Sequence, residues 1–295
     1  MKHKLFKKCA AFLLAAMTLV SAALLGGCGN KGFDFSRNIS VVVREDGSGT
    51  KSAFMEIIGL KGKTDVSGAV VATGTPAVLA EVKSNPLAIA YESLGYVTDE
   101  VKMLTVNGVA ATVENIKAGT YSIARPLQVV YKEENLTDPV NAAYFAFLAS
   151  ETAQKIIRDN GYVSLADNAA EYTVTAGLSG SIDISGSTSL RPLMVLLAAK
   201  FEEIQPGVTV TVLGGGSGTG YADAENGTSD FGMISEVFHE AKAPSCTSYI
   251  VAKDGIAIIV NTQNPLTDIT SDALKRIYDP DAGDNAVKTW AEVSR

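Results

Sequence analysis

The sequence contains little histidine and little cysteine, and these shortages exclude several kinds of chemistry. Its 295 residues include two histidines and three cysteines. His239 is the one histidine beyond residue 27, which argues against a histidine-based catalytic triad and against a multi-histidine metal site. Cys246 is the one cysteine beyond residue 28, and a lone cysteine is more often a small buried residue than a nucleophile.

Basic residues are also scarce. The chain has 25 lysines and arginines against 32 acidic residues, a formal charge of −7. Four of the lysines lie among the first eight residues, so without residues 1–27 the chain keeps 21 basic against 32 acidic residues, a charge of −11. Nucleic acids attract basic surfaces, and we therefore expect no nucleic-acid partner.

A long apolar run occurs near the N-terminus. Residues 10–25 form an uninterrupted run of small and apolar residues behind a lysine-rich start, too short for a membrane span but typical of an export signal. Leu25, Gly26, Gly27 and Cys28 resemble a lipobox, where bacterial lipoproteins are cleaved and diacylated on cysteine. We expect a signal peptide over 1–27, lipid on Cys28 and attachment to the extracytoplasmic face of the cell membrane. A plain secretion signal or an uncleaved anchor is the alternative.

The rest of the composition suits an α/β protein. Hydrophobic residues make up 46% of the chain, enough core for two ordinary domains or one large one. After a polar linker over 28–37, strand-like and helix-like runs alternate. The patterns predict helices over 76–84, 142–160 and 190–204, and strands over 87–91, 122–131, 208–213 and 255–261.

Three turns rich in glycine and hydroxyl residues each lie between a predicted strand and a predicted helix. In "SVVVREDGSGTKSAF", residues 40–54, a valine run is followed by a turn and by a helix that begins near Thr50. The free N–H groups at such a helix start, with Arg44 and two hydroxyls, suit a tetrahedral oxyanion. An ordinary solvated turn with a helix cap is the alternative for this stretch alone.

The other two turns carry the same residue types. In "DISGSTSLRPL", residues 183–193, three hydroxyl residues precede a helix. Their hydroxyl groups can either cap the helix or bind an anion. "VLGGGSGTGYADAENGTSDFGMIS", residues 212–235, has a glycine-rich turn with Ser217 but none of the GK[ST], GxGxxG or GxSxG patterns. Taken together, the three turns predict a site that surrounds an oxyanion with neutral donors and one guanidinium.

These motifs resemble one family. "ISGSTSLRPL", "GGGSGTG", "DFGMIS" and "REDGSGT" are similar to segments of the phosphate-binding proteins that feed phosphate-specific ABC transporters, as are "NPLAIAYESLGYV" and "IIRDNGYV". The resemblance covers nearly all of the chain beyond the signal. It implies a two-lobed periplasmic-binding-protein-like (type II) clamp, each lobe a mixed sheet flanked by helices. It further implies an interlobe site for inorganic phosphate, ABC permease subunits as partners, a monomer, no cofactor and no catalysis.

The order of the motifs differs from the order in that family, where "GSTS" comes first and "NGYV" last. Here the chain starts before "REDGSGT", reaches "NGYV" at residues 160–163 and then supplies "GSTS". We interpret it as a circular permutant in which residues 164–181 link the old ends, and we expect Arg295 to lie close to Asn38. A fragment of a longer duplicated chain is the competing explanation. One lobe would comprise residues 119–250, and the other residues 38–118 with 251–295.

The resemblance assigns roles residue by residue. Asp46 is expected to orient Arg44, with Gly47 and Gly216 in support. Ser235 stands where some family members carry an aspartate that accepts the ligand's proton, and Glu236 where related sequences often carry arginine. These departures leave the preference for phosphate over sulfate open. The expected phosphate-binding residues are Arg44, Ser48, Gly49, Thr50, Thr188, Ser189, Ser217 and Ser235.

Three other functions remain open at this stage. The chain could be a receptor for another oxyanion, such as sulfate, molybdate or an organic phosphate. It could be a surface phosphatase that uses Ser48 or Ser217, although the sequence shows no nearby histidine, lysine or metal cluster to activate either serine. It could also be a degenerate receptor that senses its ligand without transport.

Overall fold

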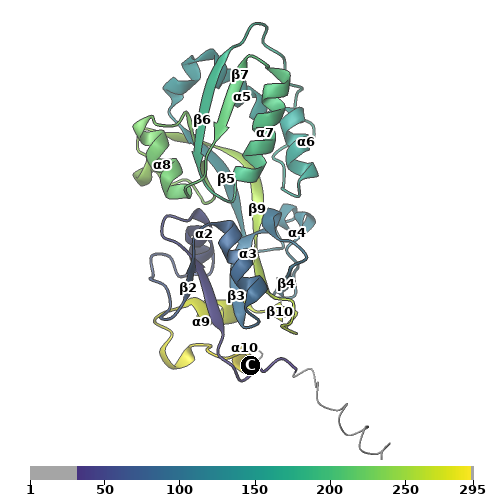
Figure 1. Ribbon diagram of the computed structural model, residues 1–295, viewed down its shortest axis with the longest axis vertical. Helices are drawn as coiled ribbons and strands as arrows, with labels where there is room; N and C mark the ends of the chain where they lie inside the picture. The colour runs from purple at the N-terminus through teal and green to yellow at the C-terminus, as the bar shows by residue number, and fades with distance from the viewer. Residues whose placement is uncertain (1–31, 294–295) are drawn as a thin grey trace, which may run out of the picture. The chain divides into compact units, whose positions relative to one another are not determined.

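The computed structural model describes residues 32–293 (Figure 1). The expected signal peptide and Cys28 lie outside the described residues. Among the residues described, no helix has both the length and the apolar character needed to cross a membrane.

Strands and helices alternate along the chain, as the sequence predicted. The strands are β1 (Ser40–Arg44), β2 (Val70–Ala72), β3 (Ala88–Ser93), β4 (Val101–Val106), β5 (Ala124–Tyr131), β6 (Gly180–Gly186), β7 (Val208–Val212), β8 (Phe231–Ile234), β9 (Thr247–Asn261) and β10 (Asp268–Ile269). The helices are α2 (Gly49–Ile57), α3 (Thr75–Ser84), α4 (Val113–Lys117), α5 (Pro139–Leu148), α6 (Glu151–Asp159), α7 (Arg191–Ile204), α8 (Ser217–Asn226), α9 (Ser271–Tyr278) and α10 (Trp290–Val293).

The strands join in one mixed sheet whose centre is the long strand β9. The order is β2-β1-β3-β9-β5-β8-β6-β7, with β4 pairing with both β9 and β10. The first part of β9 pairs with β5 as far as Gly255, and its second part, from Ile256 on, pairs with β3 and β4. Because one strand serves both halves of the sheet, the halves are connected by continuous backbone. The mixed α/β fold class that the sequence predicted is confirmed.

The elements on the two sides of β9 pack around separate cores. The first group, called lobe A here, contains β5–β8 and α5–α8 around a core that includes Tyr144, Phe201 and Phe231. The second group, called lobe B, contains β1–β4, β10, α2–α4, α9 and α10. In lobe B the ring of Phe54 stacks on Tyr91 at 4.1 Å between centroids and meets Tyr278 edge-on at 4.9 Å.

Two of the predicted elements have different bounds from those expected. The single helix predicted over 142–160 is two helices, α5 and α6, because Ser150 caps a new helix: its Oγ accepts a hydrogen bond from the N–H of Ala153 at 3.4 Å. The strand predicted to begin at Gly255 already begins at Thr247, since its polar first part pairs with β5.

The start and the end of the described chain pair with each other. The N–H of Ile39 donates to the carbonyl of Lys288 at 2.8 Å, and the N–H of Ala291 donates to the carbonyl of Phe35 at 2.8 Å. Asn38 forms a β-bridge with Thr289. The expected closeness of the two chain ends is therefore confirmed for these residues, whereas Arg295 itself lies outside the described range.

Candidate functional site

The turn between β1 and α2 holds the first set of predicted site residues. Arg44 is the last residue of β1 and is buried. Gly47 turns the chain with φ of 83°, a conformation that glycine adopts without a steric penalty. Ser48 caps α2 by accepting a hydrogen bond from the N–H of Lys51 at 3.4 Å. Thr50 thereby lies in the first turn of α2, where backbone N–H groups have no partner within the helix.

Lobe A supplies the second set from the starts of α7 and α8 and the end of β8. Ser187 Oγ accepts from the N–H of Leu190 at 3.2 Å within the turn that precedes α7, whereas Thr188 and Ser189 face lobe B. Ser217 begins α8, and its Oγ accepts from the N–H of Ser235 at 3.1 Å. The hydroxyl oxygens of Ser217 and Ser235 lie 3.4 Å apart.

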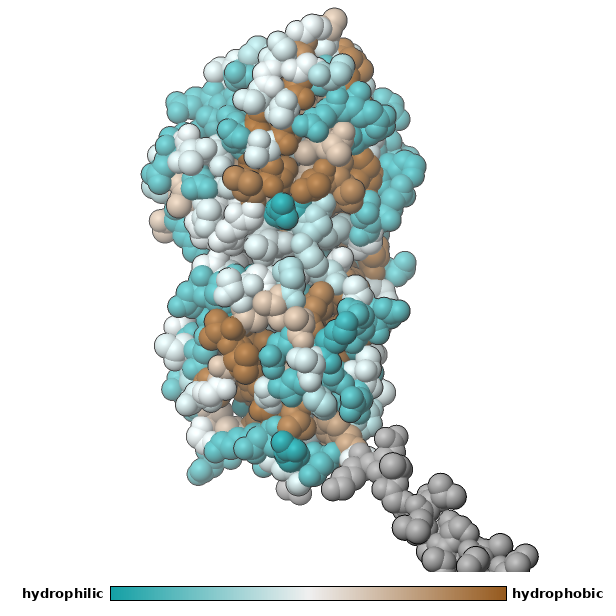
Figure 2. Space-filling view, in the orientation of Figure 1, coloured by the Kyte–Doolittle hydropathy of each residue, from teal (hydrophilic) through white to brown (hydrophobic). Residues whose placement is uncertain are grey.

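The two sets of residues meet across the lobes. Arg44 Nη2 donates to Thr188 Oγ1 at 3.0 Å, and Thr50 Oγ1 lies 2.9 Å from Ser189 Oγ. The N–H of Gly218 donates to the carbonyl of Gly47 at 2.9 Å. Figure 2 shows a belt of near-neutral hydropathy over this junction, between more apolar areas of the two lobes. The structure therefore brings together hydroxyls that are more than 130 residues apart in sequence.

Glycine allows this close approach. Gly49 packs directly on Ser217 and Ser235, and a Cβ atom added to it would overlap Ser217 Oγ and lie 2.8 Å from Ser235 Oγ. Gly216 lies less close to the opposite turn, since its Cβ would be 3.2 Å from the carbonyl oxygen of Gly47. At Gly47 an added Cβ atom would meet nothing within 4 Å, so the requirement for glycine there comes from its positive φ rather than from close packing.

Asp46 does not have the role that the resemblance implied. Its side chain is fully exposed and pairs with Lys51 at 2.8 Å, which draws it away from Arg44. Glu45 holds the guanidinium of Arg44 instead, through bonds of 3.0 Å from Nε and from Nη2. Burial opposes the charged form of Arg44, but the hydrogen bond to Glu45 and the charges of Glu45 and Glu92 outweigh it and raise the pKa of Arg44.

The sequence analysis missed a second buried guanidinium. Arg125 lies on β5, opposite Asp254 of β9, and donates from Nη2 to that carboxylate at 3.2 Å. Its Nη1 donates to Thr50 Oγ1 of lobe B at 2.7 Å and to the carbonyl of Ser235 of lobe A at 2.9 Å. One side chain thus contacts the connecting strands and both lobes. A charged residue inside an otherwise apolar strand was the signal that could have revealed it.

Two buried carboxylates were missed as well. Glu92 on β3 is fully buried and lies 3.6 Å from Arg44 Nη1. Asp254 accepts from Ser93 Oγ at 2.8 Å in addition to Arg125. Burial raises the pKa of both carboxyl groups, against the attraction of the nearby guanidiniums.

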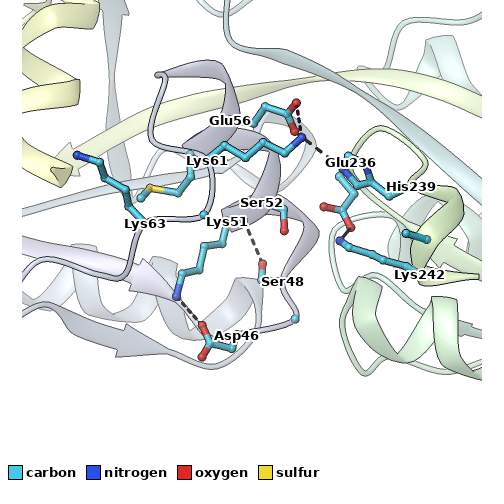
Figure 3. A pocket seen from close by; sticks show the side chains of 14 residues that line it. Asp46, Ser48, Lys51, Ser52, Glu56, Lys61, Lys63, Glu236, His239 and Lys242 are labelled. Atoms are coloured by element: carbon cyan, nitrogen blue, oxygen red, sulfur yellow. Dashed lines mark hydrogen bonds and ion pairs between the residues drawn. The ribbon is translucent and has the colours of Figure 1, made fainter. Parts of the chain in front are cut away.

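A cavity of about 480 Å³ opens beside the hydroxyl cluster (Figure 3). It is lined by Gly47 and Ser48 of lobe B and by Glu236 and His239 of lobe A. Glu236 is buried and accepts from Lys242 Nζ at 2.7 Å; in Figure 3 the two side chains point toward each other. The carboxylate of Glu236 is thus paired with a lysine of its own lobe.

The arrangement suits an anion. The hydroxyl residues Thr50, Ser189 and Ser217 lie in or next to the first turns of α2, α7 and α8, where unpaired N–H groups and the helix dipole favour negative charge. Hydroxyls can donate additional hydrogen bonds, and two guanidiniums supply positive charge. In the described part of the chain, no group of three or more His, Cys, Asp or Glu side chains is arranged to hold a metal ion.

Two α/β lobes on a shared strand, with anion-binding groups between them, define a periplasmic-binding-protein-like domain. A profile of the PBP superfamily domain matches residues 33–152 and 172–294. The chain belongs to this superfamily and, within it, to the family of the phosphate-binding proteins of ABC transporters.

Individual relatives match the chain to different extents. "Phosphate-binding protein PstS 2" of Streptococcus agalactiae is 32% identical over 304 aligned residues, which cover all of this chain and 99% of that protein. A crystal structure of a phosphate ABC transporter phosphate-binding protein from Streptococcus pneumoniae aligns with a TM-score of 0.69 and 32% identity, over 87% of this chain and 99% of that one. "Phosphate-binding protein PstS" of Bacillus subtilis is 37% identical over 119 residues, 39% of this chain and 38% of that protein.

Proposed function

We propose that this chain is the extracytoplasmic phosphate receptor of an ABC importer and that it binds inorganic phosphate between lobe A and lobe B. The observation that carries the proposal is the buried cluster of hydroxyls, helix N-termini and two guanidiniums that both lobes build together. Its full-length relatives carry the name phosphate-binding protein. They are transport proteins rather than enzymes.

The expected binding residues have distinct tasks in this proposal. Arg44 supplies charge, and Ser48, Gly49 and Thr50 offer hydroxyls and the N–H groups of α2. Thr188, Ser189, Ser217 and Ser235 complete the shell from lobe A. In the structure Arg44 bonds to Thr188, and Thr50 to Ser189, across the lobes, so a bound phosphate would replace those contacts with charge-assisted ones.

The mechanism is lobe closure. A ligand that contacts both lobes stabilises the closed arrangement, which the permease would recognise. We place the lobe boundaries at residues 38–118 with 251–295 for lobe B and 119–250 for lobe A. The pairing partners of β9 change between Gly255 and Ile256, five residues after the boundary proposed in this strand. We further propose that Cys28 carries the lipid anchor and that the receptor is a monomer.

A phosphatase is not favoured by the contacts of the two candidate serines. Ser48 Oγ accepts from a backbone N–H of α2, and Ser217 Oγ is paired with Ser235. Neither contact supplies a base that could remove the hydroxyl proton, as a nucleophilic serine requires.

Calorimetric titration of the purified protein with inorganic phosphate tests the proposal. We expect one phosphate per chain and weaker binding of sulfate at the same pH. Lys155→Ala is a suitable control because Lys155 pairs with Asp159 on an exposed face of α6, and its loss should leave the affinity unchanged. No phosphate binding, or sulfate binding as tight as phosphate binding, would contradict the proposed function.

A further inference from the structure

The candidate site holds more carboxylates than guanidiniums. Among the side chains that the structure places in this cluster, Arg44 contacts Glu45 and Glu92, and Arg125 contacts Asp254. With every group ionised, the three carboxylates exceed the two guanidiniums by one negative charge. An anion would therefore enter a cluster whose cations already have carboxylate partners, and its own charge would add to the excess.

Glu92 is the carboxylate of this cluster that lies farthest from its guanidinium, at 3.6 Å against 3.0 Å for Glu45 and 3.2 Å for Asp254. It is fully buried on β3, and its Oε1 accepts from the N–H of Ser93 at 2.7 Å and from Thr75 Oγ1 at 3.2 Å. Its Oε2 is buried and accepts no hydrogen bond, and the guanidinium of Arg44 lies 3.6 Å away. A buried ionised oxygen without a hydrogen bond is costly, and burial accordingly raises the pKa of Glu92.

The groups around Glu92 come from several elements. The charges of Arg44 on β1 and Arg125 on β5 favour its ionised form. Glu45 and Asp254 reach it indirectly, through Arg44 and through Ser93. Three phenols whose pKa values are raised, chiefly by burial, also interact with it and are neutral near neutral pH; they belong to Tyr91, Tyr96 and Tyr162. The ionised state of Glu92 therefore depends on guanidiniums that also serve the anion site.

We propose that anion binding is coupled to protonation of Glu92. When the anion engages the guanidinium of Arg44, the carboxylate of Glu92 loses part of its electrostatic support and binds one proton from the solvent. The product is a neutral carboxylic acid, and the proton offsets one negative charge brought in by the anion. Glu92 then makes the affinity depend on pH. This inference rests on the proposed function, because it concerns the same anion site.

Calorimetry can count the proton directly. Inorganic phosphate is titrated into the purified protein at one pH in buffers with different ionisation enthalpies, and the slope of the observed enthalpy gives the protons bound per phosphate. The titration is done above the second pKa of phosphate, where the free ligand keeps a fixed protonation state. We expect uptake on the order of one proton, and an affinity that falls by about tenfold per pH unit where Glu92 titrates.

Glu92→Gln is the informative variant, because glutamine has the shape of the protonated side chain and cannot ionise. We expect it to bind phosphate at least as tightly as the native protein at alkaline pH, without the extra proton and with a flatter pH profile. Its thermal unfolding midpoint, measured in parallel, checks that the variant is folded. If Glu92 only oriented Arg44, the Glu92→Gln variant would instead bind phosphate more weakly than the native protein at every pH.

Glu45→Gln is the matched control. Burial opposes ionisation of Glu45, but hydrogen bonds from Arg44 and from the N–H of Gly74 outweigh it and lower the pKa of Glu45. This variant should bind phosphate more weakly and still take up the proton. Equal proton uptake by the native protein and Glu92→Gln, or weaker binding of Glu92→Gln at all pH values, overturns the coupling. Absence of phosphate binding to the native protein contradicts the proposed function itself.

Discussion

Arg44 and Arg125 are both buried at the site, but the structure holds them in different ways. Arg44 is fixed by two bonds to its sequence neighbour Glu45, so its position depends on a local contact. Arg125 is fixed by Asp254, which lies 129 residues away in sequence and is its pairing partner on the adjacent strand. The sequence therefore could reveal Arg44 beside a glycine-rich turn, whereas the position of Arg125 depends on strand pairing between distant segments.

Truncation of Arg44 should weaken the site. Arg44→Ala removes a charge-assisted contact, and we expect phosphate affinity to fall by about 2 to 5 kcal/mol, as for other buried charged pairs. Calorimetric titration measures this loss. An unchanged affinity would show that Arg44 lies outside the binding site.

Gly49 offers a steric test of lobe closure. Because a Cβ atom at this position would collide with Ser217 and Ser235 of the other lobe, Gly49→Ala should hold the lobes apart and reduce phosphate affinity by at least about tenfold, or 1.4 kcal/mol. The unfolding temperature should change little, since alanine suits the first turn of α2. Gly218→Ala is the control: its Cβ would lie 3.4 Å from Gly47 Cα, an ordinary contact. Equal affinities of both variants would contradict this account of closure.

At the level of elements, β5 and β9 carry a buried ion pair at the junction of the lobes. Arg125→Met would leave Asp254 buried without its cation, and we expect a loss of about 3 to 5 kcal/mol in the free energy of unfolding. Asp254→Asn in the same chain should restore part of that loss. Denaturant unfolding of the two single variants and the double variant gives the coupling energy. If the losses in unfolding free energy of the two single variants simply added up in the double variant, the two side chains would have no energetic interaction.

The elements themselves were largely predictable, and the exceptions have local causes. Periodicity and turn residues located α3, α7, β3, β5 and β7 to within a few residues. The break between α5 and α6 was missed because Ala142–Asn160 reads as one helical pattern, although Ser150 and Glu151 provide a capping signal. The buried Glu92 was missed because the site was predicted from glycine- and hydroxyl-rich turns alone. A charged residue inside the strand-like run "LAIAYES" was the signal for it.

At the level of the whole molecule, the proposed permutation concerns the order in which the segments follow one another along the chain. The full-length alignment with the protein of Streptococcus agalactiae shows that this order is shared with that relative. The match to the protein of Bacillus subtilis covers about two fifths of each chain, as a colinear alignment would give if the same segments were joined in a different order. This partial match supports the proposed permutation, and the pairing of residues 35–39 with 288–291 gives it a geometric basis.

A rearranged chain tests the permutation. Val293 would be linked to Phe35 through the residues that follow it and a short Gly/Ser linker, and new ends would be opened between Ala176 and Gly177. Both of these residues are exposed, and the segment 164–179 contains no helix or strand. Since the paired ends already lie together and loop-closure entropy changes slowly with loop length, we expect the free energy of unfolding to change by no more than about 2 kcal/mol.

Phosphate affinity should likewise stay within about tenfold of the native value, which is 1.4 kcal/mol. Opening the same linked chain between Ala252 and Lys253 is the matched control, because that cut falls inside β9, the strand that both lobes share. We expect the control to lose cooperative unfolding, since the backbone that connects the two halves of the sheet is then interrupted. If the chain opened at Ala176 failed to fold while the one cut in β9 folded, the segment order would be part of what specifies the structure, and the permutation proposal would be wrong.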